Sequence, residues 1–363
     1  MDRLQLGNVL WQRVFQPHLF RKDAEAAHQA TIGMLVRLQG AGLLSVLRFL
    51  YQSPYVEQPG YIGRVRWRNR VGVAAGFDKH GEAVAALDAI GFGAIEVGTV
   101  VPRPQFGNER PRVFRYPDCR AIINRYGFNS VGAHAMAENL ARCFASNRIR
   151  AVVGVSLGKN KDTPDNRAVD DYIDALSVVL PVLRPGRDYV KVNISSPNTP
   201  GLRDIFQRLD AFLAEFFKRA SDTAAKLGLA LPPVYLKIPP DMLNYSAFER
   251  IMAVSGNLGV AAIEATNTTV DATIKRQHGL TEVGGLSGAP LRELATKCLT
   301  QLNQINQLPG WHRLDLIGLG GIDSVDAASE KRNAGADAIQ LYTGLIFEGP
   351  ILLHNILDDW RRE

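Results

Sequence analysis

The chain has 363 residues, of which 46% are hydrophobic and 21% are charged, and its formal net charge is +6. This length allows a large buried core, and the composition is ordinary for a soluble globular protein. The basic residues are spread along the chain without a nucleic-acid-binding motif, so we expect no nucleic-acid partner. The three cysteines form no CxxC pair, so neither a disulfide framework nor a metal site is predicted.

Residues 1–52 differ in character from the rest of the chain. Apolar residues recur at helical spacing in 6–14 and 32–38, and Asp23 is a suitable N-cap for the second of these helices. A third apolar run covers residues 43–51. The segment carries six basic residues against three acidic ones, and short amphipathic helices with a basic bias can lie in a membrane interface. A helical pair that caps a barrel fits the same pattern.

From residue 53 to residue 363, short apolar runs alternate with helix-like stretches. Eight such runs begin at Val71, Ala94, Ala151, Tyr189, Val234, Val260, Asp315 and Asp337. Strands that are apolar throughout are typical of a parallel sheet covered by helices. The count predicts an α/β fold with a closed (β/α)8 TIM barrel, and an open doubly wound sheet is the alternative. Two domains are therefore predicted, a helical extension at 1–52 and a barrel at 53–363.

The loops that follow these strands carry the chemistry in such a barrel. Here they are rich in Gly, Asn, Thr and Lys and poor in acidic residues, as in 75–79, 195–201 and 266–269. A site of this kind suits an anionic ligand and lacks the paired carboxylates of a glycosidase. Glycines at 318–321 and the YTG at 342–344 follow the last two strands, where barrels usually bind phosphate. No GxGxxG follows the first strand, so a Rossmann-type nicotinamide site is not predicted.

Seven motifs in order resemble the dihydroorotate dehydrogenase family: AAGFDK, NRYGFNS, GKNKDTP, NISSPNTPGLR, ATNTT, GGLSG and QLYTG. The resemblance extends from about residue 20 to the end of the chain. It implies a barrel with one non-covalent FMN, which oxidises (S)-dihydroorotate to orotate by hydride transfer to the flavin in pyrimidine biosynthesis. The alternatives are a related flavin barrel acting on another pyrimidine or on tRNA, a Schiff-base lyase that uses Lys237, and a non-catalytic membrane-binding protein.

The resemblance also implies residue roles on the substrate side. Ser196 occupies the place of the catalytic base in the quinone-linked class, where the soluble class has cysteine. Planar amide side chains donate and accept hydrogen bonds together, which matches a ring that carries amide and imide groups. The residues implied to bind dihydroorotate are Lys79, Asn124, Arg125, Tyr126, Gly127, Phe128, Asn193, Asn198, Asn267 and Thr268.

A second set of residues is implied to bind FMN. Lys237 would stand beside the flavin ring, where positive charge favours the reduced anionic form. Ser156 departs from the family pattern, which commonly has asparagine there, and its shorter side chain weakens that assignment. The implied set is Ala75, Gly76, Phe77, Asp78, Lys79, Thr99, Ser156, Asn193, Lys237, Thr266, Gly288, Gly321, Tyr342 and Thr343, the last three at the phosphate.

Ser196 and the N-terminal helices together imply the quinone-linked class. In that class the helical extension holds the enzyme to the membrane and opens a tunnel to the flavin, and His28 and Arg115 match positions in the tunnel lining. We therefore expect a peripheral protein on the cytoplasmic side of the cell membrane, monomeric, with a membrane quinone as its electron acceptor.

Overall fold

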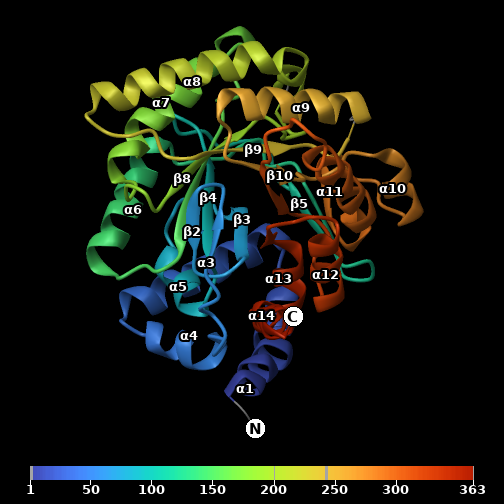
Figure 1. Ribbon diagram of the computed structural model, residues 1–363. Helices are drawn as coiled ribbons and strands as arrows, with labels where there is room; N and C mark the ends of the chain where they lie inside the picture. Colours follow the sequence, from blue (N-terminus) through green and yellow to red (C-terminus); the bar gives the residue numbers. More distant parts are fainter. Residues whose placement is uncertain (1–2, 200, 242–243, 363) are drawn as a thin grey trace.

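A closed barrel of eight parallel strands forms the centre of the computed structural model, which describes residues 3–199, 201–241 and 244–362 (Figure 1). The strands are β3 (Val71–Asp78), β4 (Ala94–Val100), β7 (Val152–Leu157), β8 (Tyr189–Asn193), β9 (Val234–Ile238), β10 (Ala262–Ala265), β12 (Asp315–Gly318) and β13 (Ala338–Leu341). Each pairs with the next, and β13 pairs with β3 to close the ring. All eight predicted strands are confirmed, and the open-sheet alternative is wrong.

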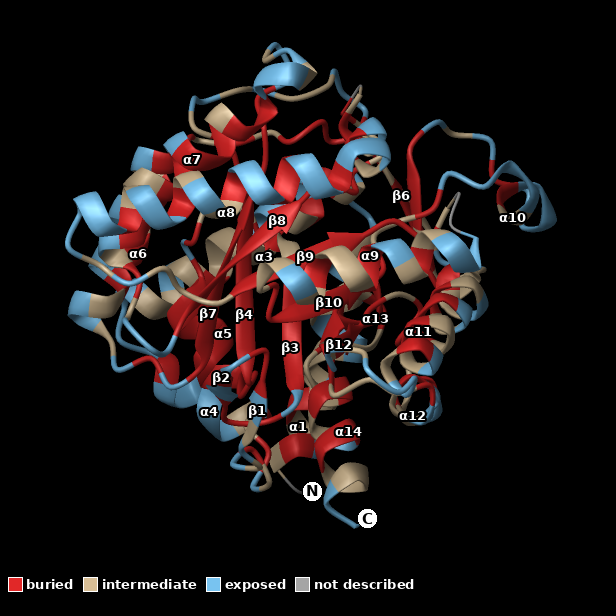
Figure 2. Cartoon of the chain, turned by 45° about the horizontal axis from the view of Figure 1, so that its top comes forward, coloured by how far each residue is buried: buried red, intermediate tan, exposed pale blue. Residues whose placement is uncertain are grey.

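Helices cover the outside of the barrel. They are α5 (Val84–Ile90), α6 (Ala133–Ser146), α7 (Ala168–Val179), α8 (Leu209–Lys226), α9 (Tyr245–Leu258), α11 (Arg292–Asn306), α12 (Val325–Asn333), α13 (Thr343–Glu348) and α14 (Ile351–Arg361). In α8 the buried side chains of Phe212, Phe216 and Ala220 recur every four residues, and Figure 2 shows the resulting bands of buried and exposed surface. This amphipathic pattern is what directs one face of the helix onto the barrel.

A three-stranded antiparallel sheet, which the sequence did not predict, comes from two long excursions between barrel elements. It consists of β5 (Val113–Tyr116), β6 (Ala121–Asn124) and β11 (Gly285–Gly288) in the order β11-β6-β5. The first two strands lie between β4 and α6, and the third follows α10 (Ala272–Gln277). The sheet therefore joins two parts of the chain that are far apart in sequence.

At the amino ends of its strands the barrel is closed by a short hairpin, β1 (Gly60–Ile62) and β2 (Val65–Trp67). The indole of Trp67 stacks on the ring of Tyr189, at the start of β8, with 6.3 Å between centroids. Residues 60–67 thus form a plug at the amino ends of the strands.

The N-terminal segment is helical, as predicted. It contains α1 (Arg3–Leu10), a π-helical stretch at 11–15, α2 (Gln16–Phe20), α3 (Ala24–Gly40) and α4 (Leu44–Tyr51), and α1 lies beside α14 (Figure 1). The Asp23 carboxylate caps α3 by accepting hydrogen bonds from two backbone N–H groups at 3.0 Å, as expected. In the described part of the chain no single helix could span a membrane, but the bent pair α3 and α4 meets that test by length and composition.

A buried ion pair attaches α3 to the excursion that precedes β5. Arg112 donates three hydrogen bonds to the Glu25 carboxylate at 2.7, 3.0 and 3.2 Å, and Arg110 donates a fourth at 3.0 Å. The side chains of Glu25 and Arg112 are only 7% and 6% exposed. Burial alone would raise the pKa of Glu25, but the two guanidinium groups hold it below its ordinary value.

We expect Glu25→Gln to lower the free energy of unfolding by about 3 kcal/mol, because Arg112 would keep a buried charge without its counter-ion. Urea unfolding followed by tryptophan fluorescence measures this. Since the folded-state pKa of Glu25 is depressed, its contribution is present above the unfolded-state pKa and disappears as the pH falls through the folded value. The exposed neighbour Glu109→Gln is the control. Equal stability of the two variants at pH 7 would contradict this role.

Candidate active site

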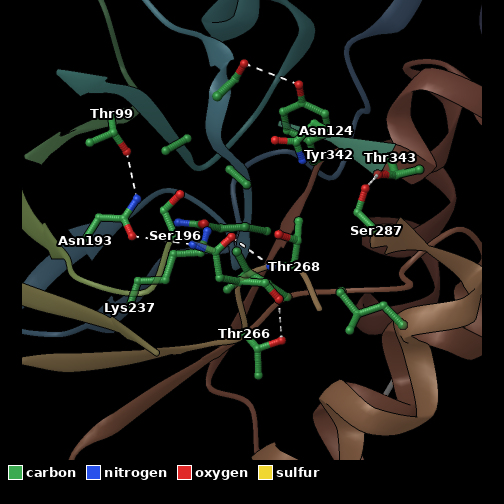
Figure 3. A pocket seen from close by; sticks show the side chains of 18 of the residues that line it. Thr99, Asn124, Asn193, Ser196, Lys237, Thr266, Thr268, Ser287, Tyr342 and Thr343 are labelled. Atoms are coloured by element: carbon green, nitrogen blue, oxygen red, sulfur yellow. Dashed lines mark hydrogen bonds between the residues drawn. The ribbon is translucent and has the colours of Figure 1, made fainter. Parts of the chain in front are cut away.

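A polar cavity of about 150 Å3 opens at the carboxyl ends of the barrel strands (Figure 3). Loops from around the ring and both excursions contribute to it. Of the predicted site residues, it is lined by Ala75, Gly76, Lys79, Thr99, Asn124, Tyr126, Gly127, Phe128, Asn193, Ser196, Asn198, Lys237, Thr266, Asn267, Thr268, Gly288, Gly321, Tyr342 and Thr343. Residues spread over most of the chain therefore meet at one place.

Four residues predicted to bind substrate or FMN do not line this cavity, and the side chains of two of them make other contacts nearby. The Arg125 guanidinium donates to the carbonyl oxygen of Pro111 at 2.7 Å, and its Cζ lies 4.7 Å from the centroid of the Phe114 ring. The Ser156 hydroxyl is fully buried and shares a hydrogen bond of 2.8 Å with the hydroxyl of Thr99. Thr99 lines the cavity and Ser156 does not, so Ser156 reaches it only through its hydrogen bond to Thr99.

The other two, Phe77 and Asp78, belong to β3. The Asp78 carboxylate accepts hydrogen bonds from the backbone N–H groups of Glu82 and Ala83 at 3.0 and 2.8 Å, which fixes the loop after the strand. Burial raises the pKa of Asp78 to about 6. Phe77 faces a second cavity, which is described below.

The amide of Asn193 is held in a defined orientation at the end of β8. Its Nδ2 donates to Thr99 Oγ1 at 2.8 Å, and its Oδ1 accepts from Ser195 Oγ at 3.0 Å. Asn267 Nδ2 donates to the same Ser195 hydroxyl at 2.9 Å. Because each amide bonds to a neighbour that is itself bonded, both side chains are fixed before any ligand binds.

Ser196 and Asn198 lie in the same loop, closer to the cavity. Asn198 Nδ2 donates to the carbonyl and side-chain oxygens of Asn124 at 3.1 and 3.3 Å, which links the loop to β6. Ser196 is 7% exposed, and its Oγ accepts a hydrogen bond from the Asn198 backbone N–H at 3.3 Å. The hydroxyl is therefore sheltered from bulk water and keeps its proton available for donation.

Two lysines supply positive charge. Lys237, on β9, is 6% exposed, and burial followed by the nearby Lys191 charge lowers its pKa to about 8. Lys79 has its Nζ 4.6 Å from the centroid of the Tyr126 ring, and burial together with the Arg112 charge lowers its pKa to about 8. Both ammonium groups still carry a proton at neutral pH, so the cavity favours an anionic ligand.

Two glycines occupy positions where no other residue fits. Gly288 has φ +97°, and a Cβ there would lie 2.2 Å from the carbonyl oxygen of Arg120. Gly321 has φ +75°, and its Cβ would lie 2.4 Å from the Arg292 backbone. These close approaches explain why glycine follows β12 and ends β11 at the cavity wall.

The sequence missed two polar residues in the lining, Ser287 and Gln340. The Ser287 hydroxyl lies 2.8 Å from that of Thr343 and also donates to a backbone carbonyl of β6. Gln340 is 2% exposed, and its Oε1 has no hydrogen-bond partner among the described residues. Both lie inside recognised motifs, GGLSG and QLYTG, but local sequence does not show which strand side chains face the cavity.

Comparison with known proteins gives a consistent result. Residues 61–363 match the family model of dihydroorotate dehydrogenase. The chain is 41% identical over 350 residues to "Dihydroorotate dehydrogenase (quinone)" of Stenotrophomonas maltophilia, covering 96% of this chain and 95% of the relative. It is 43% identical to the protein of the same name from Alkalilimnicola ehrlichii, with 95% and 97% covered. The chain belongs to the dihydroorotate dehydrogenase family.

The solved structures agree with this membership. Ligand-free DHODH from Eimeria tenella superposes with a TM-score of 0.78 at 32% identity, covering 93% of this chain and 94% of that one. The chain is therefore an oxidoreductase, as the resemblance implied.

A second cavity of the dehydrogenase, about 290 Å3 in volume, lies between the N-terminal helices and the barrel. Its walls are mainly apolar, and they include Phe77 and both predicted tunnel residues, His28 and Arg115. The Arg115 guanidinium donates to the carbonyl oxygen of Phe20 at 2.9 Å and covers its ring. The basic group is thereby kept at the cavity wall by α2.

Aromatic rings connect the two cavities. The His28 and Phe77 rings meet edge to face with centroids 5.6 Å apart, and the rings of Phe77 and Tyr342 do so at 6.0 Å. Tyr342 lines both cavities. A molecule in the apolar cavity would therefore be separated from the polar cavity only by aromatic side chains.

Burial, reinforced by the Lys79 charge, lowers the pKa of His28 to about 4. The folded protein thus keeps this imidazole neutral, while the unfolded chain protonates it near pH 6.5. As the pH falls from about 6.5 to about 4, His28 binds a proton in the unfolded state but not in the folded state, so the free energy of unfolding decreases.

We expect His28→Gln to lose less stability than the wild type between pH 7 and pH 5, because the variant has no imidazole to protonate on unfolding. Urea unfolding at the two pH values measures the difference. The exposed His134→Gln serves as the control. The pKa assignment is wrong if His28→Gln and the wild type lose equal stability over this interval.

Proposed function

We propose that the protein oxidises (S)-dihydroorotate to orotate in de novo pyrimidine biosynthesis, with FMN as the hydride acceptor and a membrane quinone as the final electron acceptor. The observation that carries this proposal is the convergence of Ser196, four asparagines and two lysines on one polar cavity. The names of the quinone-dependent relatives support the same substrate and acceptor.

The cavity has the groups that FMN requires. Lys237 offers positive charge and Gln340 an unpaired buried oxygen. The hydroxyl of Thr343, which lies 2.8 Å from that of Ser287, and the glycine-rich loop after β12 line the same cavity. The proposed FMN contacts are Ala75, Gly76, Thr99, Asn193, Lys237, Thr266, Gly288, Gly321, Tyr342 and Thr343. When bound, FMN would accept the hydride that leaves the substrate.

On the substrate side, the asparagines would hold the ring of dihydroorotate and Lys79 its carboxylate. Asn193 and Asn267 are already oriented by Ser195, and Asn198 is braced against Asn124. Little side-chain freedom would then be lost on binding, which favours a productive geometry.

Ser196 would remove the substrate proton. A serine hydroxyl is a weak base, so as Oγ accepts the substrate proton its own proton would pass to solvent through a hydrogen-bonded relay or a positioned water. The backbone N–H of Asn198 points at this oxygen and would stabilise the negative charge that develops on it. The low exposure of Ser196 would limit this exit to an ordered water and keep bulk solvent away.

Residues 1–52 would form the membrane-associating extension, and the apolar cavity beneath it would admit the quinone past His28 and Arg115. Apolar side chains of this segment are exposed, with Val14 at 54% and Phe49 at 56%. Exposed apolar side chains beside basic residues are typical of helices that lie in a membrane interface. We expect peripheral attachment at the cytoplasmic side of the cell membrane and a monomeric protein.

Replacing Ser196 with alanine removes the proposed base and leaves the asparagines in place. We expect dihydroorotate binding to change little and flavin reduction to slow by about 10²–10⁴-fold, the usual contribution of a positioned base. Anaerobic stopped-flow absorbance of the flavin measures the rate.

The matched control is Ser195→Ala, which also removes a hydroxyl from this loop. Because it frees Asn193 and Asn267, it should weaken dihydroorotate binding, but at saturating substrate it should slow flavin reduction much less. Ser196→Cys should keep activity that rises with pH, because a thiol ionises near pKa ~8.5. A wild-type rate of flavin reduction in Ser196→Ala would refute the role of Ser196.

The quinone route can be tested by filling the apolar cavity. Ala27 lines it and is 5% exposed, so the ring of Ala27→Phe should occupy space that the quinone needs. We expect quinone-dependent reoxidation to slow by about tenfold or more, a barrier increase of about 1.4 kcal/mol. Flavin reduction by dihydroorotate should be unchanged.

The control is Ala26→Phe on the exposed side of the same helix, which should leave both half-reactions intact. If Ala27→Phe slows flavin reduction as much as reoxidation, the apolar cavity does not serve the quinone alone and the assignment fails.

A further inference from the structure

Four ionisable side chains meet inside the barrel, a place that apolar side chains usually fill. They are Glu96 on β4, Lys191 on β8, Lys237 on β9 and Glu264 on β10. Three of them are completely buried, and only Lys237 reaches the polar cavity. Each buried charge costs several kcal/mol in lost hydration, so the presence of this quartet calls for an explanation.

The quartet is one connected set. Lys191 donates to the carboxylates of both Glu96 and Glu264, the second at 3.0 Å. The Lys237 ammonium lies 3.8 Å from the same oxygen of Glu264. Strand register places Lys237 beside Glu264, whereas Lys191 pairs with Tyr235, one layer deeper. Lys191 therefore contacts the cavity only through its neighbours.

Glu96 and Glu264 have different surroundings. Glu96 accepts hydrogen bonds from Tyr189 Oη at 2.8 Å and from the Ala75 backbone N–H at 3.3 Å. Glu264 Oε1 has no partner in the part of the chain that the structure describes. The Glu96 carboxylate is thus stabilised by hydrogen bonds from the protein, whereas Glu264 has a carboxylate oxygen that can carry a proton.

The surrounding charges separate the two carboxyl groups further. Burial would raise the pKa of Glu96, but the Lys191 charge lowers it below the ordinary value. Burial and the Glu96 charge raise the pKa of Glu264. Burial likewise raises the pKa values of Tyr189 and Tyr235 well above 10, so both phenols stay neutral.

The charges of Glu96 and Lys191 therefore cancel. The two carboxylates raise the pKa of Lys191 by more than burial lowers it. The remaining pair, Glu264 and Lys237, decides the net charge at the floor of the cavity. Lys191 opposes a proton on Lys237, and Glu264 favours it.

We propose that Lys191 and Glu264 are positioning residues that act through Lys237. They set how firmly Lys237, at the floor of the polar cavity, keeps its proton when a negative charge is added in the cavity. The proposal rests on the proposed function, because the flavin would bring that charge. A cation at the floor stabilises added electrons, so proton retention by this pair raises the flavin potential.

The test is the midpoint potential of FMN bound to the full-length protein, measured by spectroelectrochemistry from pH 6 to pH 10. If the pKa of a group differs between the oxidised and the reduced protein, the slope of midpoint potential against pH changes near that pKa. This change of slope is the bend. We expect Glu264→Gln to move this bend to lower pH, since Lys237 loses an attractive neighbour. Lys191→Met should move it to higher pH, since a repulsive charge is gone. Each shift should be about one pH unit or more.

The double variant Lys191→Met/Glu264→Gln controls for damage to the barrel, because the two effects oppose each other and the bend should return toward its wild-type position. If Lys191→Met alone does not fold, the isosteric Glu264→Gln still has a defined expected direction. Bound FMN with an unmoved bend in every folded variant would overturn this inference and leave the proposed function standing. A wild-type protein that binds no flavin would overturn both.

Discussion

Closure of the barrel is the constraint on which the rest of the structure depends. Hydrogen bonds between β13 and β3 pair Gln340 with Gly72 and Leu341 with Val73. Once the last strand joins the first, no barrel strand has an open edge, and all eight carboxyl ends face one mouth. The glycine loop after β12 and the asparagine loop after β8 can then line the same cavity, although they are far apart in the chain.

Around this barrel the protein forms two cavities of opposite character. The polar one is lined by amides, hydroxyls and lysines, and the apolar one by the inner faces of α3 and α4. Asn124, Tyr126 and Tyr342 contribute to both linings. If the proposed function holds, this arrangement would let a polar substrate and an apolar electron acceptor approach a common centre from different sides.

The barrel interior adds a third element, the quartet of buried charges below the polar cavity. Its members come from four different strands, and their contacts require that β8, β9 and β10 keep their register. A shift by one residue would turn Lys191 or Glu264 outward. The electrostatics of the cavity floor are therefore a property of the closed sheet and of no single motif.

The amino-acid sequence by itself determined the features that depend on near neighbours. Apolar runs with turn residues between them predicted all eight barrel strands, Asp23 predicted the start of α3, and the loop motifs identified the family. These signals are local, because strand periodicity, helix capping and turn chemistry each involve residues a few positions apart.

Tertiary structure alone decided which distant residues meet. Asn124 donates to the carbonyl oxygen of Gly285, 161 residues away, across a sheet that no local pattern predicted. Lys191 likewise contacts Glu264 on a distant strand. The Arg125 guanidinium donates to the carbonyl oxygen of Pro111 and does not line the cavity. Such contacts follow from how strands pair and pack, and a side chain's direction is settled only when its neighbours across the sheet are in place.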